Sequence, residues 1–457
     1  MKGVETWSYA PYRPLLFDVG DIYICRVVPA SDSIHLEWMP AGETYRIFYR
    51  LRGAETFQTA GETVQTAYNI IGLKREMTYE FYVQAGVKRS RIRLARCGDA
   101  VGSIVNYLHP DDEAYSFSGR YLCSPSLLRH PDGYWLASMD VFAAGEPQNL
   151  TLIFRSDNDG QTWHYVSELF PCFWGKLFLH KGELYMLGCS TEYGDLLIGK
   201  SNDGGRTFGV PTVIARGANG KNGVPGFHTN PQNMMVCNHR LWRALEWGSW
   251  GIDKHVAMVI SCDIDDDLLK PSNWSISAPV AFSPDFAFET KGYGKNTAMI
   301  EGTLAVAPDG TIVNVMRFHQ PGKAIAFTVC KEHPQAAMTY RTLIDLPINR
   351  SKFIIQYDAV GKLYYTIGCY VYDESEKSNA RNWLVLLTSP DLIHWSVKQS
   401  IYDYHETDHK KIGFQYVDFC FDGEDIAFLC RTAINGAKGY HDSNYLTFDR
   451  IKDFRKL

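Results

Sequence analysis

The sequence predicts an all-β protein with two domains, and three features carry this prediction. Short segments of alternating apolar and polar residues recur along the 457 residues, separated by turn signals such as Pro131-Asp132-Gly133. One polar turn of eight residues occurs twice, beginning at Ser156 and at Ser201, which lie 45 residues apart. No long segment shows the period of an amphipathic helix. The regular spacing indicates a small β-sheet unit that repeats.

Residues 1–105 are predicted to form a β-sandwich. Period-two alternation marks strands at residues 22–27, 33–38, 45–50, 79–84 and 90–94. Leu73, followed six residues later by Tyr79, resembles the tyrosine corner of fibronectin type III domains, and Trp38 stands where such domains keep a core tryptophan. This resemblance implies a spacer or a sugar-binding module. The simpler expectation is that the domain packs on the rest of the chain and stabilises it.

The repeated turn follows the pattern S-x-[DN]-x-G-x-T-[WF], and a shortened third copy begins at Ser389. Its Asp or Asn side chain accepts hydrogen bonds from backbone N–H groups, and its Gly supplies the positive φ that the reversal needs. The aromatic eighth residue, Trp163 or Phe208, is expected to pack between sheets. The turn resembles the Asp-box (BNR repeat) of sialidase-like β-propellers. There it lies at the rim of a blade, so its carboxylates are poor catalytic candidates.

Residues 106–457 are therefore predicted to form a β-propeller. About 350 residues, divided by the roughly 50 that one four-stranded blade takes, give a seven-bladed β-propeller, with six blades as the second choice. The ligand pocket of a propeller lies on its axis, where inner strands of several blades converge. Functional residues are thus expected on several inner strands, far apart in the sequence.

Composition argues against two kinds of partner. The net charge is -5 and the pI about 6.3, so no overall basic field draws the chain to nucleic acid. No apolar stretch is long enough to span a membrane. The first residues lack the apolar segment of a secretory signal, and the 11 cysteines contain no C-x-x-C pair. We expect a cytoplasmic protein with reduced thiols, either a monomer or a homodimer.

The most distinctive residues lie near the C-terminus, at residues 413–426 (GFQYVDFCFDGEDI), 431–433 (RTA) and 440–444 (YHDSN). With further matches over roughly residues 120–450, they resemble sialidase-like propellers that act as polysaccharide lyases. The ulvan lyases and the rhamnose–glucuronate lyases are the examples. The resemblance implies a carbohydrate-active enzyme that cleaves uronic-acid oligosaccharides by β-elimination.

Such an elimination removes a C–H proton beside a carboxylate, so the site needs a cation, a base and an acid. Arg243 is the expected clamp on the carboxylate, with Arg317 or Arg431 as a second cation, because arginine is permanently charged and binds carboxylates in a bidentate manner. His228, in a loop flanked by Gly and Pro, is the expected base or acid. Tyr416 is a candidate acid.

The other candidates are polar or aromatic residues of the same domain. Glu301 is a candidate general acid, and His319 and His441 are reserve catalytic groups. The residues expected to contact the sugar are Trp174, Trp250, Lys352, Arg431, Asp140, His319 and His441. Each has a structural alternative: blade packing for the tryptophans, a hydrogen bond between blades for Tyr416, and closure of the last blade for His441.

Two residues depart from the pattern of the related lyases, which often have His where this chain has Met139 and Tyr where it has Phe227. The changes leave open a shifted mechanism, another substrate or lost activity. Two further functions are therefore considered. One is a sialidase-like exo-glycosidase with a carboxylate acid and a Tyr or carboxylate nucleophile, although no Arg-Ile-Pro motif occurs in the chain. The other is a glycan-binding propeller without activity.

One segment, running from His405 to His409, matches the H-E-x-x-H motif of zinc proteases. That motif binds zinc only on a helix, which brings both histidines onto one face. No helical period flanks the segment, so a polar loop is predicted there. No metal or cofactor is assigned, although the resemblance leaves room for a structural divalent metal.

Overall fold

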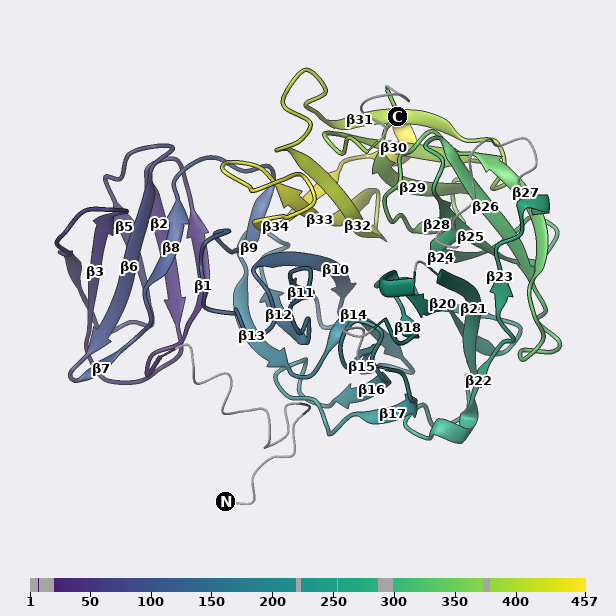
Figure 1. Ribbon diagram of the computed structural model, residues 1–457, viewed down its shortest axis with the longest axis horizontal. Helices are drawn as coiled ribbons and strands as arrows, with labels where there is room; N and C mark the ends of the chain where they lie inside the picture. Colours follow the sequence, from purple (N-terminus) through teal and green to yellow (C-terminus); the bar gives the residue numbers. More distant parts are fainter. Residues whose placement is uncertain (1–6, 8–19, 219–222, 253, 287–298, 373–378) are drawn as a thin grey trace.

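The computed structural model describes Trp7 and residues 20–218, 223–252, 254–286, 299–372 and 379–457. Nearly all regular structure in these residues is β-strand, which confirms the all-β prediction. A small two-sheet unit lies beside a larger ring of sheets (Figure 1). In the part of the chain that is described, no helix has the length and apolar character needed to cross a membrane.

Residues 20–96 form two sheets that share one core. The first has the order β1-β2-β5, and the second has the order β4-β3-β6-β7 with β8 paired to β6. The strands are β1 (Ile24–Pro29), β2 (Ser33–Trp38), β3 (Tyr45–Leu51), β4 (Gln58–Thr63), β5 (Ala67–Ile71), β6 (Thr78–Ala85), β7 (Lys88–Arg89) and β8 (Arg93–Arg96).

The core between these two sheets follows from the alternation in sequence. Every second residue of β2 and of β6 is buried, as expected for strands with one face on a core. Trp38 packs against Tyr45 with 5.2 Å between ring centroids. The hydroxyl of Tyr79 accepts a hydrogen bond from the backbone N–H of Lys74 at 2.9 Å, a contact of the tyrosine-corner kind. Assignment of the unit to the fibronectin type III class stays a prediction.

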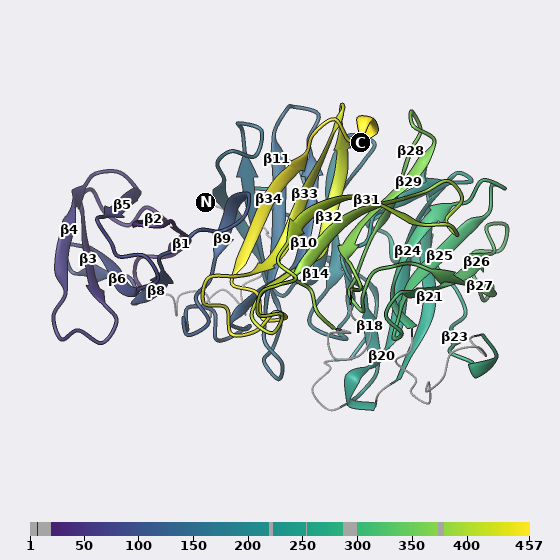
Figure 2. The same ribbon diagram turned by 90° about the horizontal axis from the view of Figure 1, so that it is seen from above.

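The rest of the described chain forms six sheets around a common centre, as Figures 1 and 2 show. Five follow the chain in order, namely β10–β13, β14–β17, β18–β23, β24–β27 and β28–β31, and the sixth has the order β32-β33-β34-β9. Their strands are β9 (Ser103–Tyr107), β10 (Tyr121–Arg129), β11 (Trp135–Phe142), β12 (Leu150–Ser156), β13 (His164–Leu169), β14 (Phe173–His180), β15 (Glu183–Cys189), β16 (Leu196–Ser201), β17 (Thr212–Ala215), β18 (Gly226–His228), β19 (Met235–Cys237), β20 (Arg240–Ser249), β21 (Lys254–Asp263), β22 (Trp274–Ile276), β23 (Val280–Ala281), β24 (Met299–Val306), β25 (Ile312–Phe318), β26 (Lys323–Val329), β27 (Thr339–Asp345), β28 (Ile355–Asp358), β29 (Leu363–Cys369), β30 (Trp383–Ser389), β31 (Ser396–Asp403), β32 (Gly413–Asp422), β33 (Asp425–Ala433) and β34 (Tyr445–Ile451).

The expected number of seven blades is not matched, because the described residues form six such sheets. The expected number came from dividing the length of the domain by about 50 residues per blade. It is too high because one sheet is larger than that. The third sheet has six strands instead of four, so it uses more of the chain.

The expected domain boundary after residue 105 also differs from the structure. Strand β9 pairs with β34, so residues 103–105 belong to the ring of sheets and not to the N-terminal unit.

Pairing of β9 with β34 closes the ring with strands from opposite ends of the domain. Inner strands of neighbouring sheets also contact one another, and β32 of the last sheet contacts β10 of the first. Side chains reinforce these contacts: Ser126 accepts the N–H of Leu177 at 3.0 Å, and Asp418 accepts the N–H of Leu127 at 2.6 Å. The inner strands are therefore held at fixed positions around the axis.

The three polar turns connect the third and fourth strands of their sheets, away from the axis. In the first, Ser156 accepts the N–H of Gly160 at 2.9 Å and Asn158 accepts the N–H of Thr162 at 2.9 Å. The copies at Ser201 and Ser389 repeat this arrangement of side-chain acceptors. Trp163 and Phe208 are fully buried, as expected for the eighth residue. Local hydrogen bonds thus explain why the pattern is needed.

The N-terminal unit packs on the ring of sheets, in agreement with the simpler expectation for it. Arg93 and Asp112 form a buried ion pair of 2.6 Å between the two parts. The hydroxyl groups of Tyr23 and Tyr115 lie 2.8 Å apart. Farther along the ring, the indole of Trp7 is fully buried and donates to the carbonyl of Pro171 at 2.8 Å.

Candidate active site

Four inner strands carry the same irregularity near the axis. Strands β10, β14, β24 and β32 each have a register shift against their neighbour, which is the signature of a β-bulge. A non-glycine residue with positive φ lies within each bulge: Ser124 at 51°, Trp174 at 54°, Glu301 at 58° and Tyr416 at 57°. Bulges re-aim side chains. Here the four residues, far apart in the sequence, line one pocket.

These four backbones are strained, because a left-handed conformation costs a non-glycine residue of order 1–3 kcal/mol. Close packing stabilises the bulges. A Cβ atom on Gly302, next to Glu301, would lie 2.2 Å from the amide oxygen of Asn314, so a larger residue there would force this buried side chain to move. The N–H of Gly302 donates to Glu246 at 2.9 Å. Strain that the surroundings maintain is typical of functional sites.

The pocket on the axis has a volume of about 450 Å³. It brings together residues from five of the six sheets and their loops. Its lining residues are Cys123, Ser124, Phe142, Ala144, Gly145, Gln148, Phe173, Trp174, Glu192, His228, Asn230, Trp250, Glu301, Tyr416, Arg431 and His441. Seven residues expected from the sequence are among them: Trp174, His228, Trp250, Glu301, Tyr416, Arg431 and His441.

Glu301 is the centre of a hydrogen-bonded group at this pocket. One carboxylate oxygen accepts from the hydroxyl of Tyr416 at 2.8 Å and from the amide of Asn230 at 2.6 Å, and the other pairs with Arg317 at 2.7 Å. Burial by itself would raise the pKa of Glu301, but the nearby charges of Arg317 and His228 and these hydrogen bonds hold the pKa at about 2. Burial raises the pKa of Tyr416. At neutral pH Glu301 is thus a carboxylate, and it accepts a hydrogen bond from the protonated hydroxyl of Tyr416.

His228 forms a second group in the same pocket. Its Nδ1–H donates to Glu246 at 2.8 Å, and both side chains are buried. Glu246 therefore orients the imidazole with one oxygen and holds the bulge of Glu301 with the other, through the N–H of Gly302. The ring of Trp174 lies against His228, with 4.2 Å between centroids. This arrangement directs Nε2 of His228 away from its carboxylate partner.

Two further guanidinium groups surround Tyr416. Arg431 and Arg381 lie 5.0 and 5.8 Å from the centre of its ring. Both are buried, and neither forms an ion pair with a carboxylate of the described residues. Their hydrogen bonds go to neutral acceptors, namely the carbonyl of His441 for Arg431 and, for Arg381, the side chain of Gln415 and a backbone carbonyl. In each, Nε has no partner in the described chain.

Arg243, the expected clamp, lies elsewhere. It is fully buried and donates to the backbone carbonyls of Leu187 at 3.1 Å and Asn230 at 2.9 Å. Desolvation lowers the pKa of Arg243 to about 10. These contacts tie neighbouring sheets together, and Arg243 does not line the pocket where a clamp would be needed. Arg243 lies on β20, the second strand of its sheet, and alternation in the sequence does not tell which buried residues reach the axis.

Asp140 and Lys352 are also buried, although the sequence suggested that they contact the sugar. Asp140 accepts the backbone N–H of Trp174 at 2.6 Å and the hydroxyl of Thr151, and thereby supports the bulge; burial raises the pKa of Asp140 to about 7. Desolvation lowers the pKa of Lys352 to about 7, and its Nζ has no hydrogen-bond partner in the described chain. Neither residue lines the pocket, and His319 does not line it either.

The two departures from the lyase pattern do not face the pocket. Met139 is fully buried in a core between sheets, and its sulfur lies 3.8 Å from the amide of Asn106. Phe227 packs edge-on against Trp247 with 4.9 Å between centroids. Neither residue lines the pocket. These two replacements therefore leave the lining of the pocket unaffected.

Several residues at or beside the pocket were given no role in the sequence analysis. Glu192 lies in the loop between β15 and β16, and its carboxylate accepts from the amide of Gln148 at 2.9 Å. Asn230 holds Glu301, Glu246 holds His228, and Arg381 lies beside Tyr416, as described above. The only signal for Glu192 is an acidic residue in a Gly-containing loop directly after a buried strand, a feature that many surface loops share.

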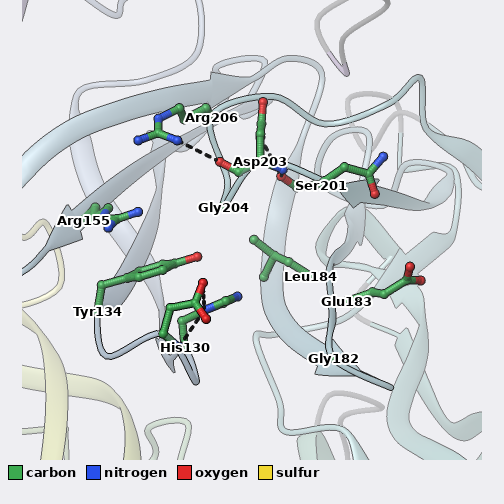
Figure 3. A pocket seen from close by; sticks show the side chains of 12 residues that line it. His130, Tyr134, Arg155, Gly182, Glu183, Leu184, Ser201, Asp203, Gly204 and Arg206 are labelled. Atoms are coloured by element: carbon green, nitrogen blue, oxygen red, sulfur yellow. Dashed lines mark hydrogen bonds and ion pairs between the residues drawn. The ribbon is translucent and has the colours of Figure 1, made fainter.

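A second cavity, of about 620 Å³, lies near the polar turn that begins at Ser201 (Figure 3). Its aromatic residue is Tyr134. The guanidinium of Arg155 lies 3.7 Å from the centre of this ring, and the imidazole of His130 stacks on it with 4.4 Å between centroids. Because Arg155 and His130 already pack on the ring of Tyr134, this ring is poorly placed to stack on a sugar. This cavity contains none of the expected site residues.

One group in the described part of the chain has the composition of a metal site. Ligand atoms of His239, Asp263 and Asp265 lie within 4.8 Å of one another at the surface. Lys181 already pairs with Asp265 at 2.7 Å, so the group is explained by ion pairs. The H-E-x-x-H segment that begins at His405 lies in turns between β31 and β32, as its sequence predicts.

Comparison with known proteins identifies the fold but no close relative. No protein-family model matches the chain, and no curated protein matches it. A Hadza microbial sialidase aligns at TM-score 0.51 with 14% identity over 95% of this chain and 96% of that one. A leech intramolecular trans-sialidase aligns at 0.50 with 9% identity over 99% and 97%. An α-L-arabinanase of Penicillium chrysogenum aligns at 0.50 with 14% identity over 78% and 99%. The chain therefore has the sialidase-like β-propeller fold.

Proposed function

We propose that this protein is a carbohydrate-active enzyme that hydrolyses a glycan bearing a carboxylate. The observation that carries the proposal is the group formed by Tyr416, Glu301 and Arg317 at the pocket on the axis. Sialidases and an arabinanase share the fold, which supports a glycan as the substrate. The size of the pocket, about 450 Å³, suits a terminal sugar and part of its neighbour.

Positive charge without a carboxylate partner supports an acidic substrate. Arg381 and Arg431 are buried beside Tyr416 without a carboxylate partner in the described chain. A buried charge without a partner is costly, and a carboxylate of the ligand would lower that cost. Arginine also provides the forked geometry that carboxylates prefer. A glycan with a sialic or uronic acid unit meets this requirement, and a neutral glycan does not.

The geometry favours hydrolysis through Tyr416. Its hydroxyl oxygen attacks the anomeric carbon while its proton passes to Glu301, 2.8 Å away. The glycosidic bond breaks, and the leaving oxygen takes a proton from an acid in the pocket. Water then attacks the anomeric carbon and gives its proton to the group that protonated the leaving oxygen, while the C–O bond to Tyr416 breaks and Tyr416 recovers its proton from Glu301. The sum of both steps adds one water molecule across the glycosidic bond.

β-Elimination is the second candidate, and His228 favours it. Glu246 orients its imidazole, and Nε2 has no hydrogen bond to the described residues, so it is able to take a C–H proton beside the carboxylate. Tyr416 would then protonate the leaving oxygen. We rank this reaction second because the tyrosine proton is directed at Glu301, whereas an acid for the leaving group should point toward substrate.

One experiment separates the two reactions. The full chain is incubated with 4-methylumbelliferyl glycosides of sialic acid and glucuronic acid and with a panel of uronic-acid oligosaccharides. Reducing ends and the ultraviolet absorbance of unsaturated uronates are followed together. Hydrolysis gives fluorescence or reducing ends without new absorbance. Rising absorbance would instead establish the lyase, and binding to the panel without any product would leave a glycan-binding propeller.

A further inference from the structure

We infer that Glu192 is the acid that protonates the leaving group in this pocket, a role that rests on the proposed hydrolysis. Of the residues that line the pocket in the described chain, two carry carboxylates, Glu301 and Glu192. Glu301 is committed to Tyr416 and Arg317. Glu192 is the carboxyl group that remains for proton transfer to the substrate.

The two carboxyl groups have opposite electrostatic surroundings. Glu301 pairs with a guanidinium and is fixed as a carboxylate. Glu192 forms no ion pair within the described chain and accepts its hydrogen bond from the neutral amide of Gln148 at 2.9 Å. Burial raises the pKa of Glu192, against a smaller opposite effect of His228. Two carboxyl groups with pKa values driven apart in one site are the usual mark of an acid and a base.

The loop that carries Glu192 is held firmly. The next residue, Tyr193, is fully buried with a positive φ of 59°, and its hydroxyl lies 3.0 Å from Nε2 of His255. The N–H of Ser190 donates to the carbonyl of Asp195 at 2.9 Å across the base of the loop. A proton donor must keep a fixed direction to act in the transition state. This loop provides that fixed direction for Glu192.

In the first step, the carboxylic acid of Glu192 gives its proton to the glycosidic oxygen as the bond to the anomeric carbon breaks. In the second step, the carboxylate of Glu192 takes a proton from the attacking water, which restores the acid. The proton of Tyr416 moves to Glu301 and returns. Each group ends in its starting state, so no further reactant is needed.

The test compares two leaving groups on Glu192→Gln. An acidic phenol leaves without help, whereas a sugar hydroxyl needs a proton. On the oligosaccharide, kcat/KM should fall about 10²- to 10⁴-fold, as expected when a general acid is lost. On the 4-methylumbelliferyl glycoside of the same acidic sugar it should fall less than about 10-fold. The matched control is Glu183→Gln. Glu183 belongs to the same sheet but lies outside the pocket, where its carboxylate pairs with Lys200.

The pH profile gives a second readout that a structural role would not change. Because Glu192 acts in its protonated form, kcat/KM of the wild type on the oligosaccharide should fall as pH rises through its raised pKa. The glutamine variant should lose this alkaline fall. Equal losses on both substrates, or an unchanged profile, would overturn the assignment while the proposed hydrolysis stands. A wild type that hydrolyses neither substrate would overturn both.

Discussion

Replacing Tyr416 by phenylalanine is the most direct test of the pocket chemistry. The change removes one oxygen atom and keeps the ring, the Cβ atom and the bulge backbone. If the hydroxyl is the nucleophile, kcat should fall about 10⁴-fold or more, as when one member of a catalytic unit is lost. The remaining rate would come from binding and from the other polar groups of the site.

The cost in stability should be small, because Glu301 keeps its other partners. The carboxylate still accepts from Asn230 at 2.6 Å and still pairs with Arg317 at 2.7 Å. One hydrogen bond to a charged acceptor is lost, which corresponds to about 1.5 kcal/mol. The variant should therefore fold normally and be almost inactive.

The assay pairs activity with urea denaturation and uses a matched control. Tyr402→Phe removes a similar hydrogen bond, from a tyrosine hydroxyl to Asp449 at 2.6 Å, outside the pocket. It should lose comparable stability and keep full activity. Retention of more than a tenth of wild-type kcat by Tyr416→Phe would refute the nucleophile role. A loss of activity only in proportion to unfolded protein would refute it as well.

Three further predictions concern charge, packing and pH. Arg431→Met should raise KM for an acidic aryl glycoside about 10²-fold, because it removes the buried cation that faces the carboxylate of the substrate. KM for a neutral aryl glycoside should not change. Equal effects on both substrates would contradict a binding role. Trp7→Ala should lower the free energy of unfolding by about 3–5 kcal/mol in urea titrations, since it empties a buried site beside Phe208, and added indole should restore part of the loss. Burial lowers the pKa of His255 to about 3. Below pH about 6.5 the unfolded chain binds this proton and the folded chain does not, so stability should fall as pH drops from about 6.5 toward 3, and His255→Phe should flatten that part of the curve.

Local features were predicted well from the sequence. The expected strand at residues 33–38 has the observed bounds of β2, and the polar turns form the hydrogen bonds that their pattern requires. Both depend on neighbours in the chain: alternation reports a half-buried strand, and a serine or aspartate reaches N–H groups a few residues away. The presence of Tyr416, Glu301 and His228 in one pocket agrees with the expectation that inner strands converge on the axis.

Features that depend on distant residues were not predicted. Arg243 and Glu192 illustrate this difference. Arg243 was expected to clamp a carboxylate but donates to the backbone carbonyls of Leu187 and Asn230, whereas Glu192 was given no role and yet lines the pocket. The alternation of apolar and polar residues identifies which side chains of a strand are buried, but not which residues they contact. The direction of a charged side chain is decided by the sheets that pack on either side of it.

The sequence by itself determined the all-β architecture, the polar turns and part of the set of residues that line the site, among them Tyr416, Glu301 and His228. Tertiary structure decided the number of sheets, the pairing of β9 with β34, and the bulges that aim Trp174, Glu301 and Tyr416 at the axis. The physical reason is the range of the forces involved. Turn and strand preferences act over a few residues, whereas closure of the ring and the strain at the bulges depend on contacts between residues hundreds of positions apart.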